Sequence, residues 1–423
     1  MLIFNAGWGK VVLQDIGEFI KRFAELAKTA PPDTLAVVVA GSIVIGVGAH
    51  WLWTKRSRQQ SIPVPPPVPN PKPAPLPDPV PATLCNMPEH ATLLEELKHY
   101  RAIDAALSKD DDELWRFRNA SPPRELLEAL SSSRVKTIVV ANNKGGVGKS
   151  TITCNLAACL DEWGFRVLVI DFDYQGSSTQ MLLRASGNPK VERSLADHLV
   201  AGNVAELDKA VKLQNGALDR LYLTRTKLIP ATYTFARMEN RLMLRWLSRH
   251  EDDDIRYNLL RVLQSPFIQD EKRGFDIVLI DAPPRLTTGT VNALCAATHL
   301  IVPTILDGLS AETVEAYLRQ IKLLVKSQLN PHIELSGVVG TMTEGKTLKP
   351  EESTELDGLR RVMKEQWSGS AEPFKTFLPD RSAFRKAAGR QLAYFTDRGE
   401  NSAREFVESL AVEVIERTGL KRK

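Results

Sequence analysis

The chain of 423 residues contains little cysteine and little excess charge of either sign. Its cysteines, Cys85, Cys154, Cys159 and Cys295, are too few for a disulfide scaffold in a chain of this length, and they form no CxxC pair that would indicate a zinc or iron–sulfur site. The seven histidines have no spacing typical of metal ligands, and a net charge of +4 does not by itself indicate nucleic-acid binding. Composition therefore excludes the small disulfide-rich class and leaves a segmented globular chain.

Long hydrophobic runs are also scarce, with one exception. Residues 34–54, TLAVVVAGSIVIGVGAHWLWT, hold 21 positions without a charge, and a helix of this length spans roughly the 30 Å of a bilayer core. Trp51 and Trp53 occupy interfacial positions, and Lys55 and Arg56 follow directly. The pattern predicts a single-pass transmembrane helix whose C-terminal side faces the cytoplasm; a buried core helix and a signal peptide are the alternatives.

Proline is concentrated in one place, because eleven of the 26 prolines fall in residues 63–81. Such a tract cannot form a helix and favours extended polyproline II, so we interpret it as a spacer. The predicted organisation is an amphipathic N-terminal segment (1–33), a transmembrane helix (34–54), a basic and then proline-rich linker (55–83), a helical region (84–133) and a C-terminal domain (134–423).

The C-terminal domain begins with a β-branched strand, a glycine-rich turn and the start of a helix. Residues 135–141 read VKTIVVA, and residues 142–151 read NNKGGVGKST. Glycines let backbone N–H groups approach a phosphate, the lysine reaches the β- and γ-phosphates, and the serine hydroxyl binds Mg²⁺. The pattern predicts a site for ATP and Mg²⁺ formed by Gly145, Gly146, Val147, Gly148, Lys149, Ser150 and Thr151.

The string KGGVGKS departs from the common phosphate-loop pattern, because Asn143 replaces the first glycine and Lys144 precedes the glycine pair. This variant resembles the deviant Walker A motif of the ParA/MinD family of ATPases. In that family the additional lysine reaches across a nucleotide-sandwich dimer to the phosphates of the partner. The resemblance therefore implies an ATP-dependent homodimer and catalytic roles for Lys144 and Lys149.

Two carboxylate motifs follow where this family has them. Residues 166–179, RVLVIDFDYQGSST, resemble the family's switch segment, and residues 275–286, FDIVLIDAPPRL, resemble a Walker B strand. The resemblance implies that Asp173 positions the attacking water, as a third catalytic residue. It also implies a metal site formed by Ser150, Asp171 and Asp281.

Strands at 299–304 and 334–343, with a helix at 311–326 between them, continue the alternation, and residues 374–381 resemble the family's last core strand and the turn that follows it. Parallel strands need right-handed helical crossovers. The sequence thus predicts an α/β domain with a doubly wound, mostly parallel sheet and the nucleotide at the carboxyl ends of the strands. Where the family often has an asparagine for adenine, this chain has Thr341, Met342 and Thr343.

The resemblance covers about residues 135–415 and implies an ATPase switch of slow turnover. Together with residues 34–54 it predicts a protein anchored in the bacterial inner (cytoplasmic) membrane, with its ATPase domain in the cytoplasm. ATP-dependent dimerisation would then control an unidentified activator, cargo or DNA. Non-specific DNA contact is assigned to Arg381, Arg385, Lys386 and Arg390.

Three alternatives remain at this point. The first is a regulator of membrane export similar to bacterial tyrosine kinases, although the last tyrosine is Tyr394 and the tail GLKRK has none. The second is an iron–sulfur reductase using Cys154 and Cys159, and the third is a scaffold that does not hydrolyse ATP. Residues 184–270, which include RMENRLMLRWLSRH, are interpreted either as a partner-binding insertion or as a lid.

Overall fold

The computed structural model describes residues 98–105, 111–116, 123–186, 191, 194–213, 223–248, 254–344, 347–367, 371–380, 382–387 and 392–421. All of them belong to one compact unit, Pro81–Lys423. The predicted segments 1–33, 34–54 and 55–83 lie outside the described residues.

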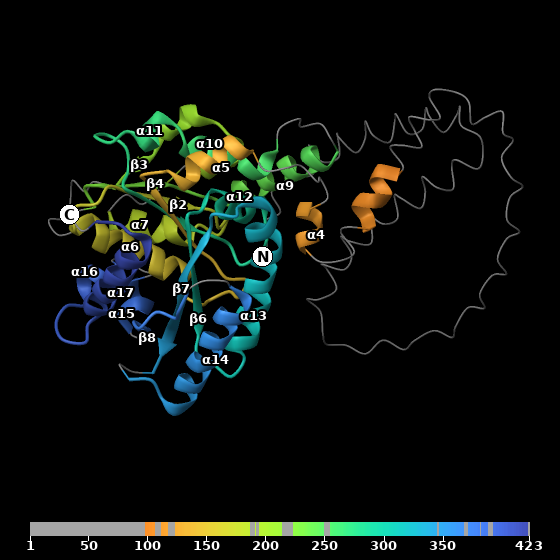
Figure 1. Ribbon diagram of the computed structural model, residues 1–423. Helices are drawn as coiled ribbons and strands as arrows, with labels where there is room; N and C mark the ends of the chain where they lie inside the picture. Colours follow the sequence, from red (N-terminus) through yellow and green to blue (C-terminus); the bar gives the residue numbers. More distant parts are fainter. Residues whose placement is uncertain are drawn as a thin grey trace, which may run out of the picture. The chain divides into compact units, whose positions relative to one another are not determined.

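The unit is built on one eight-stranded sheet in the order β3-β4-β2-β5-β1-β6-β7-β8 (Figure 1). Neighbouring strands are parallel, except for the antiparallel pair β3 and β4. This confirms the predicted mostly parallel α/β sheet. The strands are β1 (Lys136–Val140), β2 (Val167–Asp171), β3 (Val211–Lys212), β4 (Thr226–Ile229), β5 (Ile277–Asp281), β6 (His299–Ile305), β7 (Glu334–Thr343) and β8 (Leu378–Pro379).

Each central strand is buried on both faces, which explains its continuous run of apolar residues. Ile138 of β1 belongs to one hydrophobic core, whereas Val139 belongs to the other. Figure 1 shows α6, α16 and α17 on one side of the sheet and α13 and α14 on the other. The first core is covered by α6 (Lys149–Glu162), α7 (Ser177–Ala185), α15 (Ser382–Ala387), α16 (Ala393–Thr396) and α17 (Ala403–Thr418).

The second core is covered by the remaining helices of the described residues. They are α4 (Asp111–Arg116), α5 (Arg124–Ser131), α8 (Ala196–Val200), α9 (Thr234–Leu247), α10 (Asn258–Leu263), α11 (Pro266–Gln269), α12 (Thr288–Ala296), α13 (Ser310–Ile321) and α14 (Pro350–Gln366). Two 3₁₀ helices occupy Val204–Lys209 and Ile255–Tyr257, and a π-helix occupies Lys322–Leu329.

The last core strand is short. Residues 374–381 were expected to hold this strand and the turn after it, and β8 consists of Leu378 and Pro379. The register of β7 and β8 shifts between Thr341 and Thr343, since Met342 has φ +56°. Pro379 also lacks an N–H to donate. Two residues of β8, Leu378 and Pro379, therefore pair with β7.

Part of the predicted helical region 84–133 packs on the sheet unit. Residues 98–105 are helical, and α4 and α5 follow. Trp115 of α4 is fully buried, with its ring stacked at 5.8 Å on Trp246 of α9. Its Nε1 donates to the carbonyl of Leu286 at 3.3 Å, and its own carbonyl accepts from Arg256 at 2.8 Å. This segment is thus part of the core rather than a detached spacer.

The predicted localisation needs correction. In the described part of the chain no helix is long and apolar enough to cross a membrane. The longest α-helix there, α14, has 17 residues and many charged side chains, whereas a bilayer core requires about 20 mostly apolar ones. A single-pass inner-membrane protein is therefore not supported, and the segment 34–54 on which that prediction rested lies outside the described residues.

Candidate functional site

A glycine-rich loop connects β1 to α6 at the carboxyl edge of the sheet. Asn142 holds it in place: its Nδ2 donates to the carbonyl of Pro303 at 2.7 Å, and its Oδ1 accepts from the N–H of Lys144 at 3.0 Å. Gly146 and Gly148 have φ values of +75° and +90°, which side-chain-bearing residues rarely adopt. The helix begins immediately afterwards, so the unpaired N–H groups of its first turn are available to an anion.

Lys149, the first residue of α6, turns back over this loop. Its side chain is buried, and Nζ donates to the carbonyl of Lys144 at 3.0 Å. Burial lowers the pKa of the Lys149 amine, whereas the nearby Asp281 and Asp173 carboxylates raise it. The amine is thus held inside the loop beside acidic groups, where a phosphate would compete for it.

Two buried carboxylates end adjacent strands in the same register, Asp171 on β2 and Asp281 on β5. Asp281 Oδ2 accepts from Ser150 Oγ at 2.6 Å and from Ser178 Oγ at 2.7 Å, whereas Asp281 Oδ1 is buried without a partner. Desolvation raises the pKa of Asp281 to about 6. An unpartnered carboxylate oxygen beside a serine hydroxyl is a donor set that suits Mg²⁺, so these residues fit the metal.

Asp171 faces a different group of residues. Its Oδ1 accepts from the N–H of Asp173 at 3.0 Å, and its Oδ2 accepts from the N–H and Oγ1 of Thr179 at 2.8 and 2.7 Å. Burial, followed by the Asp281 charge, raises the pKa of Asp171 well above its usual value. Oδ1 therefore holds the loop at Asp173 and Oδ2 holds the first turn of α7, and the metal role of Asp171 stays a prediction. The predicted water-positioning residue, Asp173, is half-buried and accepts from the N–H of Gln175 at 2.9 Å.

Lys144 lies at the outer rim of the loop. Its Nζ pairs with Asp307 Oδ2 at 2.8 Å, and one third of its side chain is exposed. Asp307 follows β6 and precedes α13, and the hydrogen bond from Lys144 lowers the pKa of this carboxyl group. The structure thus separates the two lysines of the motif, with Lys149 inside the loop and Lys144 outside it.

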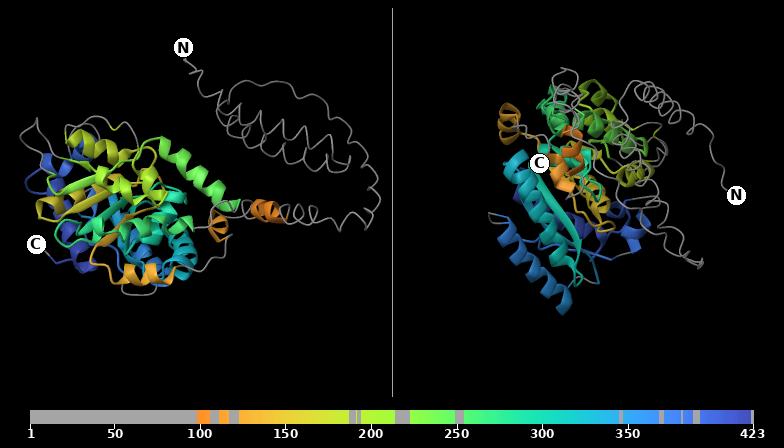
Figure 2. Two further views of the ribbon diagram at one scale, coloured as in Figure 1. Left: turned by 90° about the horizontal axis from the view of Figure 1, so that it is seen from above. Right: turned by 90° about the vertical axis from the view of Figure 1, so that its right-hand side faces the viewer.

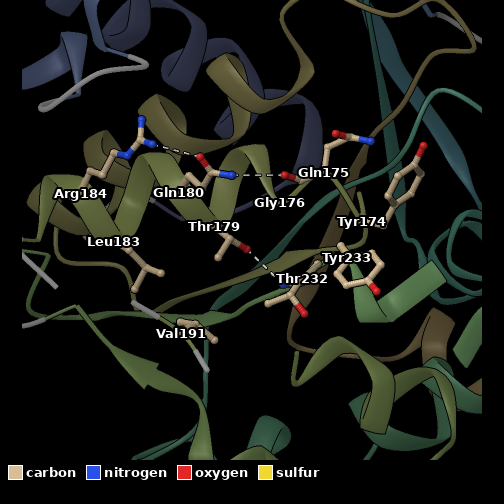
Figure 3. A pocket seen from close by; sticks show the side chains of 11 residues that line it. Tyr174, Gln175, Gly176, Thr179, Gln180, Leu183, Arg184, Val191, Thr232 and Tyr233 are labelled. Carbon is tan, nitrogen blue, oxygen red and sulfur yellow. Dashed lines mark hydrogen bonds between the residues drawn. The ribbon is translucent and has the colours of Figure 1, made fainter. Parts of the chain in front are cut away.

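One hollow adjoins the phosphate loop and another adjoins the switch segment. One, of about 240 Å³, lies between Gly148, Met342, Pro379 and Phe384, where Thr341 Oγ1 donates to the carbonyl of Val147 at 2.9 Å. The other, of about 610 Å³, lies beside the switch segment. Figure 3 shows Tyr174 and Tyr233 at one end of this second pocket and Leu183 and Val191 at the other.

Sequence reasoning missed several residues of the site. Ser178 and Thr179 belong to the motif DFDYQGSST, so the sequence could have indicated that their hydroxyl groups bind the nearby carboxylates. Asn142 and Asp307 gave no signal, because their partners Pro303 and Lys144 are 161 and 163 positions away. Only the tertiary fold brings these pairs together.

Only one side chain of the predicted basic cluster lies within the described residues. Arg381 and Arg390 lie outside them, as does the side chain of Lys386. Arg385 pairs with Asp380 at 3.3 Å and lines the 240 Å³ hollow. The contact of this cluster with DNA therefore stays a prediction.

The two cysteines of the reductase alternative lie within α6. Cys154 and Cys159 are both free and buried. Burial raises the pKa of both thiols, that of Cys159 to about 12. Buried thiols of this kind behave as small core residues rather than as accessible cluster ligands.

The loop, its lysine and serine, and the buried carboxylate of β5 define a P-loop nucleotide-binding protein. A family model described as "AAA domain" matches residues 135–335. The sporulation initiation inhibitor protein Soj of Bacillus subtilis is 34% identical over 213 residues, which cover 50% of this chain and 74% of Soj. The chromosome-partitioning ATPase Soj of Thermus thermophilus is 34% identical over 216 residues, covering 51% and 73%.

A solved complex of a Cyanothece McdA variant with ATP has the same fold, with a TM-score of 0.53, 19% identity and coverage of 69% of this chain and 99% of McdA. The chain belongs to the ParA/MinD family of P-loop ATPases. As a member of this family it is an ATP hydrolase, and Ser150 with the unpartnered oxygen of Asp281 fits Mg²⁺ beside the ATP.

Proposed function

We propose that this ATPase is a slow molecular switch, in which ATP closes a homodimer through Lys144 and hydrolysis opens it. The observation that carries the proposal is the position of Lys144, whose amine is paired with Asp307 outside its own phosphate loop. An amine at this rim can exchange Asp307 for the phosphates of a second subunit. Dimerisation would control a partner, a cargo or DNA, in keeping with the partitioning role named for the relative from Thermus thermophilus.

Each residue of the loop has a proposed role in binding. The N–H groups of residues 145–151 hold the phosphates, and Lys149 neutralises them. Ser150 and Asp281 hold Mg²⁺, which when bound offsets the negative charge that develops on the transferred phosphoryl group. Asp173 positions the attacking water, while Asp171 keeps the switch segment folded through Thr179.

The hollow of about 240 Å³ is the proposed site of the adenine base. It is adjacent to Gly148 and lined by Met342, Leu378 and Phe384, whose apolar surfaces suit a flat aromatic ring. The backbone of Met342 is in the left-handed region, with φ +56°, which places its side chain at the pocket and leaves it 44% exposed. Base selection would then depend on shape and on backbone groups rather than on an asparagine.

Light scattering of the full chain with ATP and Mg²⁺ tests the switch. We expect the wild type to form a dimer, Lys144→Ala to remain a monomer and Asp173→Ala to accumulate as a dimer. Asp307→Asn releases Lys144 from an exposed ion pair worth about 1 kcal/mol or less; since each dimer contains two such pairs, the dimer association constant should rise up to about thirtyfold. Lys364→Ala, which removes another exposed and paired lysine, is the matched control.

A chain that binds ATP but stays monomeric in all variants would contradict the proposal. In that case a scaffold or a tyrosine-kinase-like regulator becomes the better interpretation. Phosphotyrosine after incubation with ATP would then separate these two.

A further inference from the structure

Helix α9 packs against two segments, the one that holds Asp171 and Asp173 and the one that follows Asp281. Phe235 of α9 stacks on Phe172, between Asp171 and Asp173, with ring centroids 5.4 Å apart and planes 8° apart. Glu239 Oε1 accepts from the N–H of Gly289 at 2.7 Å, at the start of the helix that follows the Asp281 loop. The buried face of α9 thus contacts both segments.

The opposite face of α9 is exposed and strongly basic. Arg237, Arg241 and Arg245 recur every four residues, which places them along one side of the helix, and all three are at least partly exposed. Among the described residues, no carboxylate pairs with Arg237 or Arg241. Like charges four residues apart destabilise a helix by a few tenths of a kcal/mol per pair. A negatively charged partner would remove this repulsion.

The same face also exposes large apolar side chains. Leu244 and Tyr233 are 67% and 61% exposed, and at 100° per residue both lie on the arginine side of the helix. A hollow of about 310 Å³ adjoins this face, lined by Arg241, Arg245 and Asn258 among others. In Figures 1 and 2 the light-green α9 extends away from the sheet.

We propose that this face, Tyr233 to Arg245 with its adjoining hollow, is the docking surface for an acidic amphipathic helix of a partner protein. The arginines repeat about every 6 Å on a face roughly 18 Å long, which matches carboxylates four residues apart on a second helix. Exposed Tyr and Leu beside Arg are typical of protein interfaces, whereas phosphate backbones are contacted mostly by polar and basic groups. The proposal rests on the proposed function in one respect, since it identifies where the partner of the switch binds.

Fluorescence anisotropy with the full chain tests this surface. The probe is a labelled helical peptide of about 18 residues in which glutamates four apart line one face and leucines the other. We expect saturable binding that weakens as salt rises, because exposed charges are screened. Arg237→Glu/Arg241→Glu should weaken binding at least tenfold, and Tyr233→Ala/Leu244→Ala should weaken it severalfold. Arg361→Glu/Arg398→Glu, two exposed arginines on other elements, should leave it unchanged.

Three outcomes would overturn the proposal: no binding of the acidic peptide, equal binding by the α9 and control variants, or equal binding of a peptide with lysine in place of glutamate. A duplex DNA probe that binds more tightly than the peptide and is lost in Arg237→Glu/Arg241→Glu would replace it by a nucleic-acid surface. ATP binding by each variant checks the fold. ATP-dependent dimerisation of the wild type is measured separately, without the peptide. Failure of the docking surface can therefore be told apart from failure of the switch.

Discussion

At the scale of single residues, buried carboxylates in this chain differ by the groups around them. Asp281 has one buried oxygen without a partner, whereas Asp171 accepts from Asp173 with one oxygen and from Thr179 of α7 with the other. Glu239 faces neither a metal nor a lysine. Burial raises its pKa to about 7, although it accepts a backbone hydrogen bond from Gly289. Its ionisation should therefore oppose folding.

The sign of this effect gives a pH-dependent prediction for Glu239→Gln. Below the ordinary value of 4.5 both states carry the proton, and between 4.5 and about 7 only the unfolded state loses it. Stability contributed by the neutral acid is thus lost as pH rises through this window, on the order of 3 kcal/mol. Glutamine retains the acceptor for Gly289 without ionising, so its advantage over the wild type should grow from pH 5 to pH 8.

Urea unfolding at several pH values measures this difference. Glu365→Gln, which changes an exposed carboxylate on α14, is the control and should show much less dependence on pH. A constant difference between wild type and Glu239→Gln across the window would show that the buried carboxylate is already charged near pH 5.

At the scale of elements, α4 is an integral part of the ATPase unit. Trp115 is buried between Trp246 of α9 and the loop that follows Asp281, where its indole donates to Leu286. Truncation to alanine leaves a cavity and an unpaired carbonyl, so Trp115→Ala should lower the free energy of unfolding by about 3–5 kcal/mol. Denaturant titration followed by far-UV circular dichroism measures this loss.

Leu323→Ala is the matched control, because this leucine is 50% exposed. Its effect should be within about 0.5 kcal/mol of zero. Equal stability of the wild type and Trp115→Ala would show that α4 leaves the sheet unit in solution.

At the scale of the whole molecule, the nucleotide site connects both halves of the sheet. Its residues come from the ends of β1, β2, β5 and β7. A bound nucleotide therefore contacts segments that lie together only in the folded state. A ligand that binds only the folded state stabilises it by about 2.7 kcal/mol at one hundred times its Kd. A non-hydrolysable ATP analogue with Mg²⁺ should therefore raise the unfolding midpoint.

Lys149→Ala should remove most of this stabilisation, and chelation of Mg²⁺ by EDTA should reduce it in the wild type. Lys364→Ala, an exposed lysine on α14, should retain it. Differential scanning calorimetry with and without the analogue gives the comparison. Full stabilisation of Lys149→Ala would mean that the phosphate loop does not hold the nucleotide.

The mostly parallel sheet and the phosphate loop could be predicted from the sequence, because both depend on local order. Buried parallel strands require continuous apolar runs, and a glycine-rich turn before a helix has its own signature. Ser150, Lys149 and Asp281 could thus be named in advance. The run at 34–54 was equally distinct, but the localisation inferred from it was wrong.

Only the tertiary structure decided which side chains meet. Lys144 meets Asp307 and Asn142 meets Pro303 across the fold, and hydrogen bonds between such distant segments leave no periodic pattern in the sequence. The same holds for α9, whose arginines were visible in the sequence as a helical stretch. Its buried face contacts Phe172 and Gly289 while its basic face remains exposed, and this follows from packing, which sequence order does not encode locally.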